Sequence, residues 1–110
     1  MIEGIETIKK GEIPVIIFGA ASVGEALFHA LSNLGIKVEC FCDNNINKTK
    51  KTLQNIKIIH TSDLKSKYPE VIFFISAADI KDVVEQLKNL GYFKWFAGGL
   101  LLKDFDIYKY

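Results

Sequence analysis

The chain lacks the strong net charge and the long apolar runs that several classes of protein require. Its 110 residues carry a formal charge of only +1, so no overall field attracts nucleic acid or an anionic membrane. No apolar run approaches the roughly 20 residues that span a bilayer, and residues 1–12 carry charges where a secretory signal has its hydrophobic core. We therefore expect a cytoplasmic protein with neither a membrane nor a nucleic-acid partner.

Residues that commonly carry chemistry are also scarce. The two cysteines, Cys40 and Cys42, share one face of a predicted strand, where a disulfide between them would strain the backbone. Two thiols alone do not complete a structural zinc site. The two histidines, His29 on a predicted helix surface and His60 after a predicted strand, belong to no Ser-His-Asp pattern. We therefore predict buried cysteines, no metal site and no catalytic residues.

Apolar segments of strand and helix type alternate along the chain. The predicted strands cover residues 13–18, 37–42, 56–59, 71–75 and 93–97. The predicted helices lie within residues 1–12, from Ser22 to residue 34, just after residues 61–63, and after Asp79. Residues 43–55 are polar and are interpreted as a loop. Strands that alternate with helices predict a parallel sheet with right-handed crossovers.

The length of the chain fits one domain rather than two. We predict an α/β fold, namely a single Rossmann-like three-layer domain over residues 1–110. Its parallel sheet should have about five strands, in the order 3-2-1-4-5 when counted along the chain. The first long helix is expected to begin with a capping box, in which Ser22 is the N-cap and Glu25 lies three positions later. Asp79 is expected to cap the helix that follows it.

The segment from Val15 to Gly24 is the most informative part of the sequence. A strand-like run ends at Gly19, a helical pattern follows, and Gly24 lies five residues after the first glycine. Gly19 allows a sharp turn, and Gly24 allows the helix to pack close to the sheet. The backbone N–H groups of residues 21–24 would then lie at the positive end of the helix dipole, a position that favours a phosphate.

An acidic residue at the end of the second predicted strand completes this pattern. Asp43 follows Gly24 by 19 residues, which matches the carboxylate that hydrogen-bonds ribose in NAD sites and would repel the 2′-phosphate of NADP. Ala21 replaces the middle glycine of the dinucleotide fingerprint, so a mononucleotide or nucleotide-sugar fits more easily than a full dinucleotide. The predicted binding residues are Gly19, Ala20, Ala21, Ser22, Val23, Gly24, Asp43, Asn44, Asn45, Ser76 and Ala77. The alternative, that the glycines and Asp43 serve only turn geometry, stays open.

Several segments resemble a known group of bacterial proteins. Residues 17–20 and 41–45, with the later stretches 56–59, 63–64 and 71–76, resemble Rossmann-like nucleotide- or CoA-binding modules of polysaccharide-biosynthesis proteins. Among these are the N-terminal modules of sugar-nucleotide dehydratases and sugar acetyltransferases. The resemblance implies that the glycine turn and Asp43 face a nucleotide or nucleotide-sugar. The catalytic domains of those proteins have no counterpart in this sequence, so their catalysis is not carried over.

The C-terminal segment is unusually apolar for a tail. Seven of the thirteen aromatic residues lie between residues 92 and 110. An exposed tail of this composition is unfavourable in water, so residues 98–110 should fold back over the sheet or pack on a partner. Phe28, off the apolar stripe of its helix, is a second candidate for an exposed apolar surface. We expect a homodimer or a partner enzyme domain to dock through residues 92–110.

These features predict a binding module for a nucleotide or nucleotide-sugar, with a ligand of the NAD, CoA or UDP-sugar type and no catalytic machinery of its own. Its expected role is accessory to polysaccharide or sugar-nucleotide metabolism. Two alternatives stay open. One is a fragment of an NAD-dependent oxidoreductase whose substrate pocket comes from a dimer or another domain. The other is an interaction or dimerisation domain that keeps the fold without a ligand.

Overall fold

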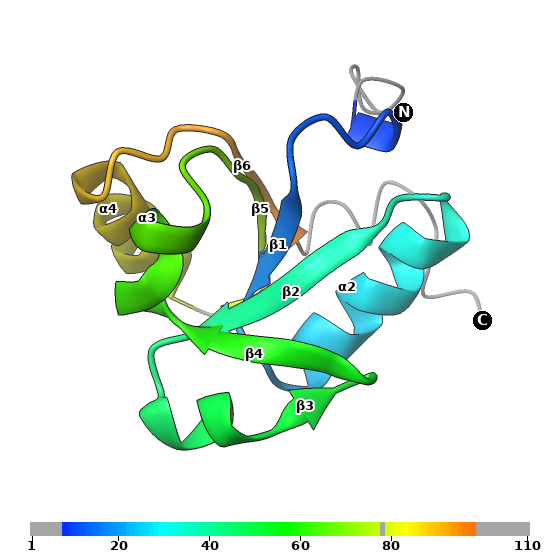
Figure 1. The fold of residues 1–110 in the computed structure, drawn as a ribbon, viewed down its shortest axis with the longest axis horizontal. Coiled ribbons are helices and arrows are strands. Elements are labelled where there is room, and N and C mark those ends of the chain that lie inside the picture. Colours follow the sequence, from blue (N-terminus) through cyan, green and yellow to red (C-terminus); the bar gives the residue numbers. More distant parts are fainter. Residues whose placement is uncertain (1–7, 78, 99–110) are drawn as a thin grey trace.

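A mostly parallel sheet forms the centre of the molecule (Figure 1). The structure is a computed structural model that describes residues 8–77 and 79–98. Within these residues the sheet has six strands in the order β3-β4-β2-β1-β5-β6, and every neighbouring pair is parallel except β3 and β4. The strands are β1 (Val15–Phe18), β2 (Val38–Asp43), β3 (Thr52–Leu53), β4 (Ile56–His60), β5 (Ile72–Ile75) and β6 (Trp95–Ala97). The α/β class and the mostly parallel sheet are therefore confirmed.

The strand order places β1 next to a reversal in the path of the chain. From β1 the chain builds outward through β2 and β4, and it then returns to add β5 and β6 on the other side. Residues Val15–Phe18 pair in register with Ile72–Ile75. The carboxyl ends of β1, β2 and β5 therefore meet at one edge of the sheet, which is where ligands bind in open parallel sheets.

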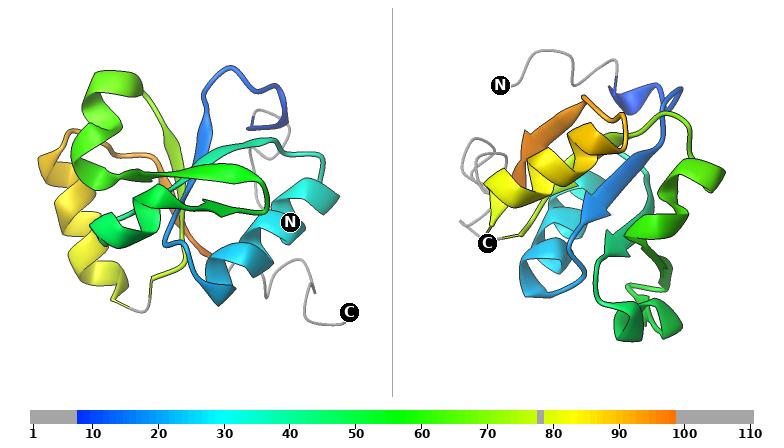
Figure 2. Two further views of the ribbon diagram at one scale, coloured as in Figure 1. Left: turned by 60° about the horizontal axis from the view of Figure 1, so that its bottom comes forward. Right: turned by 90° about the vertical axis from the view of Figure 1, so that its left-hand side faces the viewer.

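Helices cover both faces of the sheet (Figure 2). Helix α2 (Ser22–Asn33) lies on one face, while α3 (Leu64–Lys67) and α4 (Ile80–Asn89) lie on the other. Two short 3₁₀ helices complete the described structure, η1 (Ile46–Lys50) and η2 (Thr61–Asp63). No helix in the described part of the chain is long and apolar enough to cross a membrane.

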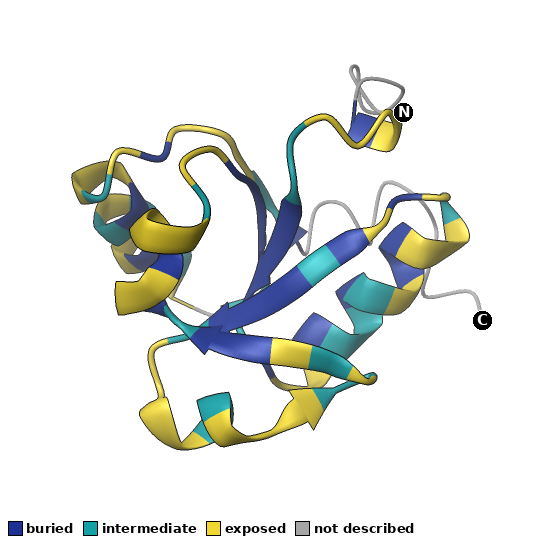
Figure 3. Ribbon diagram, viewed as in Figure 1, coloured by how far each residue is buried: buried dark blue, intermediate teal, exposed yellow. Residues whose placement is uncertain are grey.

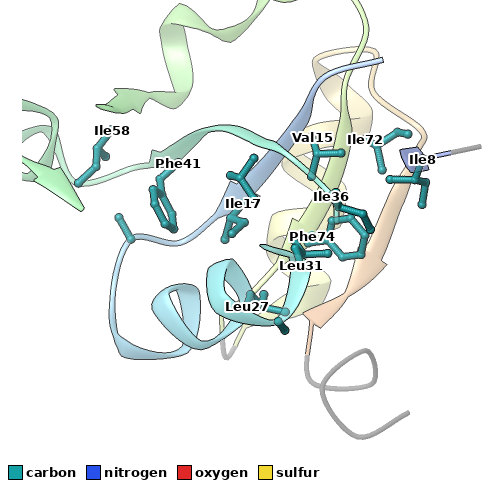
Figure 4. Packing of buried hydrophobic residues seen from close by; sticks show 13 residues of the cluster. Ile8, Val15, Ile17, Leu27, Leu31, Ile36, Phe41, Ile58, Ile72 and Phe74 are labelled. Carbon is teal, nitrogen blue, oxygen red and sulfur yellow. The ribbon is translucent and has the colours of Figure 1, made fainter. Parts of the chain in front are cut away.

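Alternating side chains of the central strands supply two separate cores. Ile17 and Phe74 face α2, where they pack with Leu27 and Leu31 (Figure 4). Their neighbours in the strands point to the opposite face and meet α3 and α4. The strands are buried along both faces, whereas the outer surfaces of the helices are exposed (Figure 3). Burial on two faces explains why the strand sequences are continuously apolar rather than alternating.

Both cysteines lie in the second core, on the α3 and α4 face of the sheet. Cys40 and Cys42 are fully buried free thiols, as predicted. Burial raises the pKa of the Cys40 thiol from 9.0 to about 11, and it raises the pKa of Cys42 well above its ordinary value. Because the thiolate is the reactive form, these cysteines are inert packing residues at neutral pH.

The segment predicted as a polar loop has more structure than expected. It contains η1 and a hairpin in which Leu53 pairs with Ile56 across Gln54 and Asn55. Both turn residues have positive φ angles, 54° and 62°, the geometry of the tight turns that match strand twist. The prediction of a loop over residues 43–55 was wrong here because a Gln-Asn pair lacks the glycine that usually marks such a turn.

The expected helix caps differ from those in the structure. Helix α2 begins at Ser22 and its N-cap is Ala21, so the predicted capping box of Ser22 and Glu25 is absent. The sharp turn at Gly19 leaves Ala21 extended, and the helix therefore starts one residue earlier than the capping pattern indicates. Asp79 occupies the N-cap position of α4 but makes no side-chain cap bond. The His60 side chain caps η2.

The aromatic residues near the C-terminus divide between core and surface. Tyr92 is buried and its hydroxyl donates to the carbonyl of Tyr68, while Phe96 stacks on Phe74 with ring centroids 5.2 Å apart. Phe93 and Trp95 are 70% and 38% exposed. Phe28 was predicted to be exposed, but it packs against the first core and Phe41. The expected N-terminal helix lies largely outside the described residues, and so does the apolar tail beyond residue 98.

Candidate functional site

The turn between β1 and α2 depends on two glycines. Gly19 has a φ of +108°, and a Cβ there would collide with the Ser76 hydroxyl at the end of β5. A Cβ on Gly24 would collide with the Gly19 carbonyl oxygen. The first glycine therefore allows the reversal of direction, and the second allows α2 to approach it closely. These are the structural roles that the sequence predicts for both residues.

Helix α2 leaves its first amides open. Within the part of the chain that the structure describes, no atom accepts a hydrogen bond from the N–H groups of residues 21–24. Ala21, Ser22 and Val23 are exposed, and Ser22 lies inside the helix, so its hydroxyl is not used as a cap. Unpaired amides at the positive end of a helix dipole attract an anion.

Asp43 is the main internal partner of this turn. One carboxylate oxygen accepts the N–H of Ala20 at 2.9 Å, and the other accepts the N–H of Asn45 at 2.8 Å. Its side chain is 16% exposed. The carboxylate thus joins the end of β2 to the turn after β1. Each oxygen still has a lone pair available for a further donor, because a carboxylate offers about four acceptor positions.

Lys48 brings a positive charge to the same turn. Its ammonium donates to the Ala20 carbonyl at 3.1 Å and lies 3.8 Å from the Asp43 carboxylate. Helix η1 carries this lysine, and the Asn45 side chain begins η1 by accepting the N–H of Asn47. The predicted site residue Asn45 therefore caps a short helix that holds Lys48 over the turn.

The two predicted binding residues that follow β5 are Ser76 and Ala77. The Ser76 hydroxyl lies 2.9 Å from the Phe18 carbonyl and 3.1 Å from the Gly19 carbonyl, and it donates to these two oxygens. The Ser76 amide donates to Phe18 as well, which extends the pairing of β1 and β5. Ala77 is partly buried against the second core. Both residues lie at the expected edge of the sheet, and their observed contacts are within the protein.

Asn44 points away from the turn and into a separate polar network. Its side-chain oxygen accepts from the Thr61 hydroxyl at 2.6 Å and from Gln86 at 2.9 Å. Its side-chain nitrogen donates back to Gln86 at 3.0 Å, so the two carboxamides form a doubly hydrogen-bonded pair. His60 reaches the Asn44 carbonyl at 3.1 Å. The predicted binding residues therefore divide into a turn site and a cleft that faces α4.

The groups described at this turn are hydrogen-bond donors suited to an anion. In the described residues, no group of three or more histidine, cysteine or acidic side chains could hold a metal ion. Asp43 already accepts two backbone hydrogen bonds and lies beside Lys48. The chemistry available at this turn is binding by backbone amides, a hydroxyl and an ammonium group.

Sequence reasoning undervalued two residues that the tertiary structure brings to this edge. Neither Lys48 nor Gln86 is among the predicted binding residues. Lys48 is 28 residues from its partner Ala20, and Gln86 is 42 residues from Asn44. No local motif links residues so far apart, so only the sheet order could have identified them.

Comparison with known proteins provides one family assignment. A family model described as "C2185-like, N-terminal" matches residues 11–94, which include the glycine turn, Asp43 and α4. No curated protein matches the chain. The matched range covers most of the described sheet, from the approach to β1 through α4.

Proposed function

We propose that this chain, which belongs to the C2185-like, N-terminal family, binds a nucleotide or nucleotide-sugar at the turn between β1 and α2. The ligand would be of the NAD, CoA or UDP-sugar type. The domain would supply binding without catalysis, in the cytoplasm, as an accessory to polysaccharide or sugar-nucleotide metabolism.

One observation carries this proposal. The open amides of residues 21–24 and the ammonium group of Lys48 lie around the same turn. A helix N-terminus and a lysine together are a common way to hold a phosphate, because both present positive charge and hydrogen-bond donors. The exposed Ser22 hydroxyl is a further donor that makes no cap bond.

The strand order supports the same location. The turn follows β1, and the sheet reverses its direction of growth between β1 and β5. In Rossmann-like three-layer domains, this reversal opens a crevice at the carboxyl ends of the strands, where a nucleotide lies. The proposed Rossmann-like character of the domain therefore agrees with the position of the open amides.

The hydrogen bonds that Asp43 already accepts limit which contacts a ligand could make with it. Its carboxylate holds the Ala20 and Asn45 amides, and only its remaining lone pairs are available to ribose hydroxyls. A 2′-phosphate at this point would meet a carboxylate that already carries negative charge. We therefore favour ligands without a 2′-phosphate.

The direct test is thermal unfolding with a ligand panel. NAD, CoA, UDP-glucose and UDP should be compared, because a ligand at 100 times its Kd stabilises the folded state by about 2.7 kcal/mol. Lys48→Met should reduce the shift given by the best ligand, since it removes the ammonium group beside the turn. Lys50→Met is the matched control, because Lys50 is exposed on the same short helix.

The outcomes of this test distinguish a nucleotide site at the turn from the absence of such a site. Stabilisation that is weakened by Lys48→Met and retained by Lys50→Met supports phosphate binding at the turn. A panel in which no compound shifts the unfolding midpoint argues against nucleotide binding. Equal losses in both lysine variants would indicate general charge attraction rather than a site.

A second candidate function is an interaction domain without a ligand. Two observations favour it. Asp43 already occupies the Ala20 amide. Phe93, which precedes β6, and Trp95, its first residue, are exposed at the edge of the described sheet. In this function the two aromatic residues would contact a second copy or a partner enzyme domain. Light scattering at high concentration tests it, because a strict monomer would count against the homodimer.

A further inference from the structure

A second concave site lies beside the turn, at the carboxyl ends of β2 and β4. This site, called here the α4 cleft, has a volume of about 530 Å³, within the range of small-molecule sites. Its walls come from the end of β2, from η2 and from one face of α4. The residues that matter for the argument are Asn44, His60, Ser62, Asp82, Glu85 and Gln86.

The floor of the α4 cleft is held in place by hydrogen bonds. Asn44 and Gln86 bind each other through both carboxamide groups, and the buried Thr61 fixes the oxygen of Asn44. The Ser62 amide donates to Nδ1 of His60 at 3.2 Å. A neutral His60 must therefore carry its proton on Nε2, which donates to the Asn44 carbonyl. The polar groups of the cleft are thus oriented before any ligand arrives.

The charge of the α4 cleft differs from that of the turn. Among the residues that the structure describes, Asp82 and Glu85 are the acidic residues that line it and no lysine lines it, although the Lys88 ammonium lies 4.0 Å from the Glu85 carboxylate. Asp79 lies close to Asp82, whose side chain raises the pKa of Asp79 through a hydrogen bond and charge repulsion. A phosphate would be repelled here, whereas hydroxyl donors would be attracted by the carboxylates.

We infer that the α4 cleft binds the hydroxyl groups of an uncharged sugar. Carboxylates and carboxamides are suited to this task, because they accept hydrogen bonds from neighbouring hydroxyls while the amides also donate. Asn44 directly follows Asp43, so the cleft and the turn share the end of β2. The inference deepens the proposed function and rests on it for the attached nucleotide: the phosphates would lie at the turn and the sugar in the cleft.

Two variants test the cleft without disturbing the turn. Asp82→Asn and Glu85→Gln remove the acceptor charge but keep the shape, and both residues are exposed on α4. Each should weaken the binding of UDP-glucose about tenfold, the usual loss for one hydrogen bond to a charged group. The affinity for UDP should remain unchanged. Glu12→Gln is the control, because Glu12 is an exposed acid outside the cleft.

Nuclear magnetic resonance locates the binding directly. On addition of UDP-glucose, the side-chain amide signals of Asn44 and Gln86 should shift, and UDP alone should leave them in place. The inference is overturned if UDP and UDP-glucose give the same shifts, or if both cleft variants bind UDP-glucose as the unmodified protein does.

A third probe separates failure of the inference from failure of the proposed function. If neither UDP nor UDP-glucose shifts the backbone amides of residues 21–24, the phosphate site is wrong. Methyl glucoside, which carries no phosphate, then decides the cleft by itself. Shifts at Asn44 and Gln86 with this sugar support the inference, and their absence overturns it.

Discussion

Replacement of Asp43 should reveal whether this carboxylate stabilises the folded protein or only contacts a ligand. In Asp43→Ala, the Ala20 amide loses its acceptor in a residue that is only 8% exposed. The Asn45 amide also loses its acceptor, but it is exposed and can turn to water. The ion pair with Lys48 is long, at 3.8 Å, and contributes little.

The expected magnitude follows from these contacts. A hydrogen bond to a charged group contributes about 1.5–3 kcal/mol, and an unpaired buried amide costs about 1–3 kcal/mol. We therefore expect Asp43→Ala to lower the free energy of unfolding by about 2–3 kcal/mol. Asp43→Asn keeps one acceptor oxygen and turns an NH₂ group toward the other amide, so it should lower the free energy by about 1–2 kcal/mol.

Urea unfolding followed by circular dichroism measures both values. Asp63→Asn is the control, because Asp63 is an exposed acid in η2 whose side chain makes no cap bond. The reasoning is refuted if both Asp43 variants are as stable as the control. If they are, and nucleotide binding is lost, Asp43 acts on the ligand alone and the turn is held by other contacts.

Two further predictions concern the glycine turn and the buried thiols. Gly24→Ala should lower the free energy of unfolding by more than about 2 kcal/mol, because the new Cβ would meet the Gly19 carbonyl oxygen. Gly11→Ala should lower it by only about 1–2 kcal/mol, because Gly11 has a left-handed backbone conformation but no atom close to the new Cβ. Equal losses in urea unfolding would contradict this comparison. The free energy of unfolding should fall by roughly 2–3 kcal/mol between about pH 9 and 11. The sign follows because burial raises the pKa of Cys40 to about 11, so the unfolded state releases its thiol proton first. Burial raises the pKa of Cys42 in the same direction, so Cys40→Ala should reduce this decline in a pH series of urea titrations without abolishing it.

Much of the fold could be predicted from local patterns. The strands around Ile17, Phe41 and Phe74 are continuous apolar runs, and α2 has its apolar residues at helical spacing. Such patterns are visible because each element must bury a face of its own. The hairpin at Gln54 was missed because its positive φ angles occur without glycine. The cap of α2 was missed because the geometry of the preceding turn decided where the helix begins.

The sequence by itself determined the place of the turn, because Gly19 and Gly24 are needed by backbone geometry within a few residues. It also indicated that the cysteines would be buried, since Cys40 and Cys42 share one face of an apolar strand of the kind that is covered on both faces. Only the tertiary structure decided which groups gather at that edge. Lys48 reaches the turn and Gln86 pairs with Asn44 across long separations in the chain. Contacts of this kind depend on how strands and helices pack, and no local preference encodes them.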